Sequence, residues 1–238
     1  MPLFLDPTYM LFMIPAFILM LIAQGYVNGA YRKWSQVRAA TGLTGAQAAE
    51  RLISSGGLNV SVDGVRGKLT DNYDPRQKVL HLSEGVYNSP SVAAVAIAAH
   101  ELGHAMQDQD GYFPLRLRAA MVPAVNIGSY LGWILIFLGL LIRSSNALLG
   151  NNMAWLGVLV FSGGALFALA TLPVEINASA RAKALLTNTG IIVGEDERRG
   201  INNVLNAAAL TYVAALVTAV MQLLYFVSLV GGLGGRRR

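Results

Sequence analysis

Four long apolar stretches, each free of Lys, Arg, Asp and Glu, constrain this chain more than any other feature. They occupy residues 8–29, 122–142, 154–174 and 207–233. Each has about the 20 residues that a helix needs to cross roughly 30 Å of hydrocarbon. Only 13% of the residues are charged, against about 25% in a typical soluble domain. Four buried core helices in a soluble protein of 238 residues are a poor alternative. We therefore predict a mostly α-helical membrane protein with about four transmembrane helices.

The first stretch could instead be a cleaved signal peptide. Against this, no Lys or Arg precedes it, Asp6 does, and its apolar run is longer than that of a typical signal peptide. We interpret it as a retained membrane anchor. The whole chain, 1–238, is then expected to form a single membrane-embedded domain in contact with the lipid bilayer.

A polar insert, residues 31–121, separates the first two stretches. Thr44 can cap a helix that ends at Ser54–Gly57. Two short β-rich runs, Leu58–Val62 and Lys78–Leu82, flank a turn-rich section and predict a small sheet or hairpin. A second helix should start after Ser91 and run without a helix-breaking residue to just before Gly111. The insert is therefore expected to be a small α+β region.

The distribution of Lys and Arg predicts the orientation in the membrane. The insert carries ten of them, the segment 175–206 carries four, and the loop 143–153 carries one. Cytoplasmic loops of membrane proteins are enriched in these residues, so the insert and the segment 175–206 should both face the cytoplasm. Arg236–Arg238 would end outside if the last stretch crosses fully, so either this tail is tolerated or that stretch does not cross fully.

Charge and cysteine content exclude several kinds of site. The net charge of +5 does not come from a basic helix with interleaved aromatic residues, so we predict no nucleic-acid partner. The chain has no cysteine, so disulfides are excluded and a metal site must use His, Asp or Glu.

The strongest chemical motif is His100-Glu101-Leu102-Gly103-His104, within the second predicted helix of the insert. A spacing of four residues is a rise of about 6 Å and a rotation of about 400°, so both imidazoles leave one face of the helix. Two imidazoles placed in this way can bind one Zn²⁺. Glu101 is then placed to accept a proton from a metal-bound water, and Gly103 allows close approach of another backbone or a substrate. A pair of surface histidines is the alternative, but the preceding run VAAVAIAA is apolar.

A hydrolytic zinc site needs a third protein ligand and an open fourth position. His81, in a strand-like run, is one candidate. Glu175, at the end of the third apolar stretch, is preferred because a carboxylate at that depth is costly unless it is paired or metal-bound. The alternative for Glu175 is an ion pair with Arg181 or Lys183. Asn177 and Ser179 could hydrogen-bond the ligands, as outer groups often do at metal sites.

At these residues the chain resembles a known family, the YugP-type bacterial membrane zinc metallopeptidases, which are distantly related to HtpX-like gluzincins. The resemblance extends from Thr41 to about Tyr225. It is carried by residues 69–75, 79–83, 91–107, 173–182 and 207–215. It implies a zincin-like insert that carries the HExxH helix, and it implies a location in the bacterial plasma membrane.

The resemblance also implies roles for individual residues. In gluzincins the two motif histidines and a downstream Glu bind zinc, and the motif Glu is the general base. Carried over, His100, His104 and Glu175 would be ligands and Glu101 the base. Many gluzincins have Asp four residues after the ligand Glu, whereas this chain has Ser179.

A Tyr or His often stabilises the oxyanion in such enzymes, and Tyr212 and Tyr73 are the candidates in this chain. The run Leu80–Ser83 could also bind an extended peptide by strand addition at a sheet edge, or could be an ordinary strand.

Three functions remain to be compared. The first is an integral-membrane zinc endopeptidase with one catalytic ion, acting on a protein or peptide substrate near the membrane, with an oligomer or a regulatory membrane partner also conceivable. The second is a non-catalytic scaffold or assembly factor whose structural zinc is closed by a fourth ligand such as His81. The third is a transporter, which the absence of charged residues within the apolar stretches disfavours. We expect the endopeptidase.

Overall fold

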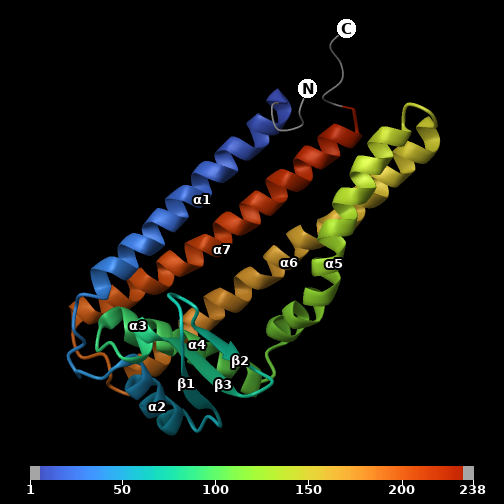
Figure 1. Cartoon of the computed structure of the whole chain (residues 1–238). Coiled ribbons are helices and arrows are strands. Elements are labelled where there is room, and N and C mark those ends of the chain that lie inside the picture. Colours follow the sequence, from blue (N-terminus) through green and yellow to red (C-terminus); the bar gives the residue numbers. More distant parts are fainter. Residues whose placement is uncertain (1–5, 233–238) are drawn as a thin grey trace. The chain divides into compact units, whose positions relative to one another are not determined.

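The structure is a computed structural model, and it describes residues 6–232. The predicted tail Arg236–Arg238 and residue 233 lie outside the described residues. Figure 1 labels the seven helices and three strands of the described part. Their bounds are α1 Pro7–Trp34, α2 Gly45–Gly56, β1 Ser61–Val65, β2 Asn72–Asp74, β3 Val79–Ser83, α3 Glu84–Tyr87, α4 Val92–Gln109, α5 Phe113–Ile142, α6 Ala147–Asn188 and α7 Glu195–Val230.

Four helices, α1, α5, α6 and α7, are long and apolar enough to cross a membrane. The predicted fold class, a mostly α membrane protein with a small α+β part, is therefore confirmed. The helices extend beyond the predicted apolar stretches. In particular, α6 has 42 residues and continues through Pro173, so that one helix carries both the third apolar stretch and Glu175.

The described chain divides into two compact units, which we call the apolar unit and the metal-site unit. Among the described residues, the apolar unit comprises residues 6–22, Leu117–Leu172 and residues 212–232, and the metal-site unit comprises Ala23–Arg116 and Pro173–Thr211. Four helices therefore contribute residues to both units.

An aromatic cluster forms the core of the apolar unit. The Phe226 ring of α7 lies 4.8 Å from Trp133 of α5 and 4.9 Å from Phe161 of α6, measured between ring centroids. Tyr9 of α1 packs edge-on against Tyr225 of α7 at 5.0 Å. Each of the four helices thus contributes an aromatic ring to one core.

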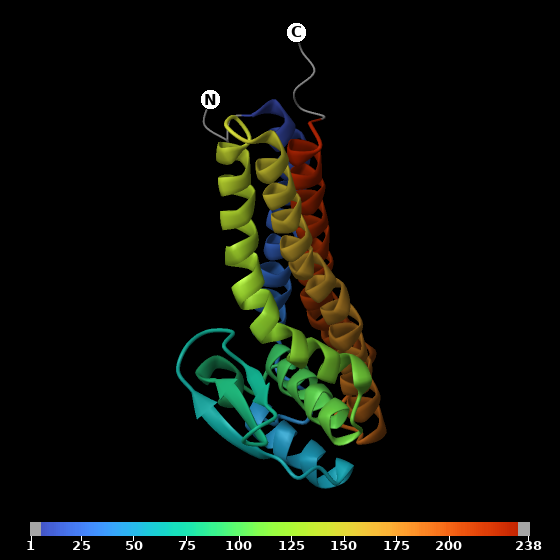
Figure 2. The ribbon, with the colours of Figure 1, turned by 90° about the vertical axis from the view of Figure 1, so that its right-hand side faces the viewer.

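Glycines bring α5 and α6 close together, and the two helices lie side by side in Figures 1 and 2. A Cβ built on Gly157 would lie 2.8 Å from the carbonyl oxygen of Gly132, and one built on Gly139 would lie 2.7 Å from that of Gly150. Small residues at facing positions allow membrane helices to pack backbone to backbone.

The sheet of the metal-site unit differs from the prediction in order and pairing. Its strand order is β1-β3-β2, with β1 parallel and β2 antiparallel to the central β3. The predicted run Lys78–Leu82 largely coincides with β3, whereas the predicted run Leu58–Val62 overlaps β1 only at Ser61 and Val62. The two strands pair in parallel, so they are not a hairpin. Asp63 and Gly64, the first residues of the predicted turn-rich section, lie within β1, and β2 was not predicted because its three residues also fall in that section.

The central position of β3 also corrects the peptide-binding prediction. Strand addition needs an unpaired edge. All five residues of β3 pair with β1, and residues 79–81 also pair with β2. At the last residue of β3, the Ser83 backbone amide donates to the carboxylate of Asp71, which directly precedes β2, at 2.7 Å. The run Leu80–Ser83 therefore has no free edge for a substrate.

The two predicted helices of the insert are confirmed. Helix α2 begins at a capping box, in which Thr44 accepts from the Gln47 amide and Gln47 accepts from the Thr44 amide. It ends at Gly56, and the capping residue Gly57 has a φ of 61°, the left-handed conformation that glycine adopts without strain. Helix α4 begins after Ser91, whose hydroxyl accepts from the Ala94 amide at 3.2 Å.

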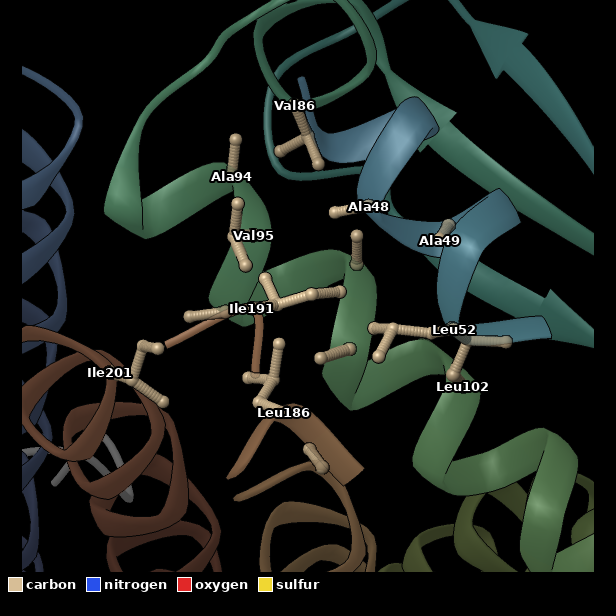
Figure 3. Close-up of a cluster of buried hydrophobic side chains, with 14 of the residues drawn as sticks. Ala48, Ala49, Leu52, Val86, Ala94, Val95, Leu102, Leu186, Ile191 and Ile201 are labelled. Atoms are coloured by element: carbon tan, nitrogen blue, oxygen red, sulfur yellow. The ribbon is translucent and has the colours of Figure 1, made fainter. Parts of the chain in front are cut away.

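Small apolar residues pack α4 into the centre of the metal-site unit. Leu102 of α4 lies against Leu52 of α2, and Leu186, Ile191 and Ile201 cover the other side of the cluster (Figure 3). The Ala-rich face of α4 is almost entirely buried. This packing fixes the helix that carries the HExxH motif.

Candidate metal centre

Helix α4 presents two imidazoles one turn apart. The His100 and His104 ring centroids are separated by 4.9 Å, and the rings are nearly perpendicular at 83°. Their side chains are only 12% and 13% exposed. The helical spacing of four residues therefore places both rings on one sheltered face, as the motif predicts.

Glu175 of α6 meets these two rings. Its Oε2 lies 3.2 Å from His100 Nε2 and 3.4 Å from His104 Nε2, and its side chain is only 2% exposed. One potential ligand atom from each of the three residues lies within 4.8 Å of the others. The structure thus gathers two nitrogen donors and one carboxylate from positions that are 71 to 75 residues apart in sequence.

Gly103 makes this meeting of α4 and α6 possible. A Cβ built on Gly103 would lie 2.3 Å from the carbonyl oxygen of Ala178, a distance that real side chains do not adopt. The sequence analysis left open whether a backbone or a substrate approaches Gly103, and in the structure it is the backbone of α6.

Glu101 is a buried carboxylate beside the three donors. It is 9% exposed, and the residues that the structure describes give its carboxylate no hydrogen bond. Burial raises the pKa of Glu101, and the nearby His100 and His104 lower it in part. Such a group is suited to accepting and returning a proton.

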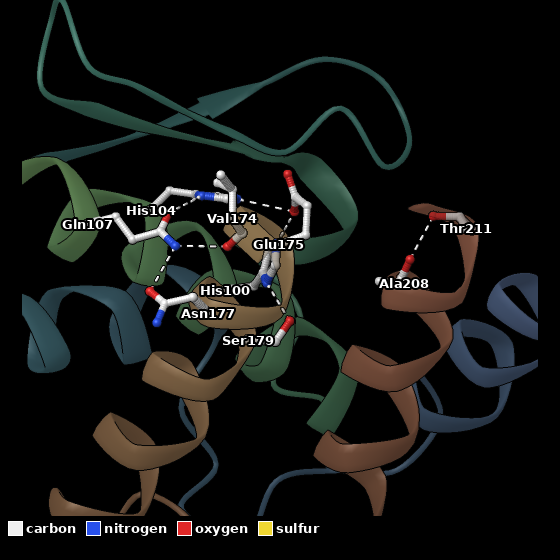
Figure 4. A network of polar contacts seen from close by, with 9 residues as sticks. All are labelled: His100, His104, Gln107, Val174, Glu175, Asn177, Ser179, Ala208 and Thr211. Atoms are coloured by element: carbon white, nitrogen blue, oxygen red, sulfur yellow. Dashed lines mark hydrogen bonds and ion pairs between the residues drawn. The ribbon is translucent and has the colours of Figure 1, made fainter. Parts of the chain in front are cut away.

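Gln107 orients His104, and the sequence analysis did not identify it. Its Nε2 donates to the Val174 carbonyl oxygen at 2.8 Å and to Asn177 Oδ1 at 3.0 Å, so its Oε1 is the end that lies 3.0 Å from His104 Nδ1 (Figure 4). Because an amide oxygen only accepts, His104 must carry its proton on Nδ1. The neutral ring then has its Nε2 lone pair available, facing Glu175.

A cation anchors this chain of hydrogen bonds. Arg181 Nε donates to Asn177 Oδ1 at 2.8 Å, and a guanidinium can only donate. Arg181 also pairs with Asp110. These contacts identify Asn177 Oδ1 as an acceptor, which fixes the Gln107 amide as its donor. The only sequence signal for Gln107 was its position three residues after His104, on the same side of the helix.

Ser179 makes the corresponding contact to the other ring. Its Oγ lies 3.2 Å from His100 Nδ1 (Figure 4). Both Nδ1 atoms are therefore engaged by polar side chains, and both Nε2 atoms face Glu175. Ser179 thus contacts a motif histidine directly, whereas Asn177 reaches His104 only through Gln107.

Three other predicted residues are not among the three grouped donors. Within the described residues His81 is not among the grouped donors, and its buried Nδ1 has no hydrogen bond. The Tyr73 hydroxyl donates to Asp108 at 2.7 Å, and burial together with this hydrogen bond raises the pKa of Tyr73. Tyr212 belongs to the apolar unit.

Arg181 and Lys183, the two cations suggested as ion-pair partners of Glu175, have other partners in the structure. Arg181 pairs with Asp110, and Lys183 donates to Asn206 Oδ1 at 3.0 Å. The carboxylate of Glu175 instead faces the two imidazoles.

The donor set suits zinc. Two imidazole nitrogens and one carboxylate form a three-ligand set found in catalytic zinc sites, which keep a further position open. Burial would lower the pKa of His104, but the hydrogen bond that its protonated ring donates to Glu175 and the charges of Glu101 and Glu175 raise this pKa overall. A proton therefore competes with a cation for His104, so metal binding should weaken in acid.

Comparison with known proteins agrees with this reading. A family model described as "Putative neutral zinc metallopeptidase" matches residues 9–231. The chain belongs to this zinc metallopeptidase family. It is also 45% identical over 206 residues to the "Putative membrane protease YugP" of Bacillus subtilis (strain 168), covering 86% of this chain and 88% of that protein. No solved structure matches the chain.

Family membership and the four membrane-length helices together establish the general class of this protein. The chain is a multi-pass membrane protein of a zinc metallopeptidase family. The resemblance stated from its motifs is confirmed.

Proposed function

We propose that this protein is an integral-membrane zinc endopeptidase that holds one catalytic zinc ion through His100, His104 and Glu175. The observation that carries the proposal is the convergence of these three donors within 4.8 Å, beside the buried carboxylate of Glu101. The family match and the similarity to a membrane protease support it.

The contacts of Glu101, Gln107 and Ser179 support a separate role for each residue in peptide hydrolysis. When bound, zinc lowers the pKa of a coordinated water and polarises the substrate carbonyl. Glu101, which lacks a hydrogen bond from the described residues, takes the proton of the attacking water and passes it to the leaving amine. Gln107 and Ser179 hold the His104 and His100 rings with each Nε2 toward Glu175, where these three residues would hold the zinc ion.

Tyr212 and Tyr73 stay as proposed oxyanion stabilisers. Tyr73 would first have to release Asp108, since its hydroxyl proton is committed there.

The substrate is proposed to be a protein or peptide reached from the cytoplasmic side of a bacterial plasma membrane. The excess of Lys and Arg in residues 31–121 and 175–206 supports this orientation. A cleavage site close to the membrane surface fits the proposed ligands, because Glu175 adjoins the third apolar stretch and His100 and His104 belong to the polar insert.

The test of catalysis is Glu101→Gln in purified, detergent-solubilised protein, with peptide cleavage and bound zinc measured together. We expect one zinc per chain to be retained and cleavage to fall at least about a hundredfold, because general bases contribute about 10²–10⁴-fold. The matched control is Glu50→Gln, at an exposed position of α2. Undiminished cleavage by the zinc-loaded Glu101→Gln protein would refute the assigned base.

The test of orientation uses the absence of cysteine in the chain. Single cysteines at Val193, between α6 and α7, and at Ser145, between α5 and α6, can be labelled in intact cells with a membrane-impermeant maleimide. We expect labelling at 145 in intact cells, and at 193 only after the membrane is opened. The reverse pattern would place the metal site outside the cytoplasm.

The scaffold alternative depended on a fourth protein ligand. Its nominated ligand, His81, is not grouped with the three donors in the described part of the chain. Firm zinc binding by wild-type protein with no cleavage of any peptide or membrane-protein substrate would favour the scaffold.

A further inference from the structure

A cationic cavity lies at the carboxyl-terminal end of α1, within the metal-site unit, and nothing in the peptidase mechanism uses it. Its volume is about 520 Å³. Arg32 and Lys68 supply its charge, and Asn28, Tyr31 and Ser35 add polar groups. We infer that this cavity binds the phosphate of an anionic phospholipid headgroup.

The two cations are available for such a ligand. Neither Arg32 nor Lys68 forms an ion pair with any residue that the structure describes, and no acidic residue lines the cavity. Asp71 lies near Tyr31, but its carboxylate accepts from the Ser83 amide at 2.7 Å and from the Ser83 hydroxyl. An uncompensated Arg and Lys facing one cavity is the composition of a phosphate site.

Neighbouring side chains support the geometry. The Lys68 ammonium lies 5.8 Å from the centroid of the Tyr31 ring, a cation–π distance that holds it beside the cavity. Gln24 donates to Asn28 Oδ1 at 3.4 Å, which leaves the Asn28 amide group as a donor. The cavity thus offers a guanidinium, an ammonium and an amide, all hydrogen-bond donors.

The position along α1 favours a lipid over free phosphate. The apolar stretch of this helix ends at about residue 29, and about 20 residues suffice to cross the hydrocarbon. Residues 28–35 therefore fall at the level of the headgroups. Gly25 and Gly29, on the wall of the cavity, have no atom within 4 Å of a built Cβ, so a bulky ligand can approach the helix backbone.

The same face of α1 continues as an apolar strip. Ile18, Leu21 and Ile22 precede Gly25 by seven, four and three residues, which is the spacing of one helical face. All three side chains are at least 50% exposed. Along this one helix, apolar side chains, then glycines, then cations follow the order of acyl chain, glycerol and phosphate in a phospholipid.

The experiment measures lipid retention by the zinc-loaded, full-length protein in detergent, using native mass spectrometry with added phosphatidylglycerol. Arg32→Gln/Lys68→Gln should retain about thirtyfold less, because each cation near an anionic headgroup contributes about fivefold. The matched control is Arg51→Gln/Arg76→Gln, which removes two exposed cations elsewhere in the metal-site unit and should leave retention unchanged. Equal loss in both double variants, or no loss in the first, would overturn the site.

Two further measurements test whether the ligand is a lipid or free phosphate, and whether the open space of the cavity is needed for binding. Inorganic phosphate at millimolar concentration should not displace phosphatidylglycerol, and full displacement would mean that the site takes free phosphate and not lipid. Gly29→Leu should lower retention without altering charge, since it fills the cavity where there is open space. Unchanged retention in Gly29→Leu would also overturn the proposal. Neither readout depends on peptide cleavage, so the proposed peptidase can fail while this site stands.

Discussion

The apolar unit and the metal-site unit use the same kinds of residue in opposite ways. In the apolar unit large apolar side chains are exposed, for example Ile127 at 70% and Leu159 at 69%, and rings of the aromatic cluster are buried. In the metal-site unit the buried face of α4 is mostly alanine, and Glu101, Gln107, Glu175 and Ser179 are buried polar residues around the donors.

The difference reflects the solvent that each surface meets. An exposed leucine is favourable only where the surroundings are hydrocarbon, whereas a buried carboxylate or amide is retained only where specific partners compensate its lost hydration. Exposure alone therefore does not tell which substitutions each unit tolerates. Three predictions test this comparison.

The largest effect is expected at the closest helix contact of the metal-site unit. Gly103→Ala should destabilise the protein by about 3 kcal/mol or more and abolish zinc retention, because the new methyl would lie 2.3 Å from the Ala178 carbonyl oxygen and must force α4 from α6. Thermal unfolding in detergent and metal analysis measure both effects.

Gly163→Ala in the apolar unit is the matched control. A Cβ at Gly163 meets nothing within 4 Å, so stability should stay equal or rise by up to about 1 kcal/mol. Zinc retention in Gly103→Ala at the wild-type level would show that α4 and α6 need not approach so closely.

An intermediate effect separates the two kinds of exposed surface. Leu159→Lys and Val193→Lys change residues that are 69% and 72% exposed, one in a membrane-length helix and one in the loop before α7. The first should cost about 3 kcal/mol, because a lysine in mid-membrane is penalised, and the second should be nearly neutral. Yield in the membrane fraction and thermal unfolding distinguish them. Equal tolerance of both changes would mean that Leu159 does not face lipid.

The smallest effect is expected from the hydrogen bond between Gln107 and His104. Gln107→Met should weaken zinc binding about 10–100-fold, as loss of outer hydrogen bonds to metal ligands typically does. Gln107→Glu keeps an acceptor for His104 Nδ1–H and should recover part of the loss. Competition with a chelator measures both affinities.

The position of the proton on the His104 ring tests the role of Gln107 directly, because a loss of packing around the site would not by itself move this proton from Nδ1 to Nε2. The chain has only three histidines, so ¹⁵N-labelled imidazoles can be resolved in metal-free protein. We expect the Nδ1–H form of His104 in the wild type and in Gln107→Glu, and a shift toward Nε2–H in Gln107→Met. An unchanged tautomer in Gln107→Met would disprove the orienting role of Gln107.

Local features of this chain could be predicted because they depend on neighbours in sequence. Apolar length decides whether a helix can cross a membrane, and the spacing of His100 and His104 places both on one face of any α-helix. The cap at Ser91 likewise acts within three residues of itself. Glu175 was identified as a candidate ligand because a carboxylate beside an apolar stretch needs a partner.

Long-range pairings could not be predicted in the same way. The sequence does not show that β3 would be the central strand, because pairing depends on which segments fold over one another. Gln107 was missed because its partners, Val174 and Asn177, are 67 and 70 residues away and act only through contact.

By itself, then, the sequence determined the membrane-length helices and the helix that carries the HExxH motif, since both follow from backbone geometry repeated over a few turns. Only the tertiary structure decided that Glu175 meets the two imidazoles and that Gln107 directs His104 toward it. The physical reason is that a carboxylate or an amide is a ligand or an orienting group only when packing, here through Gly103 against Ala178, brings it within bonding distance.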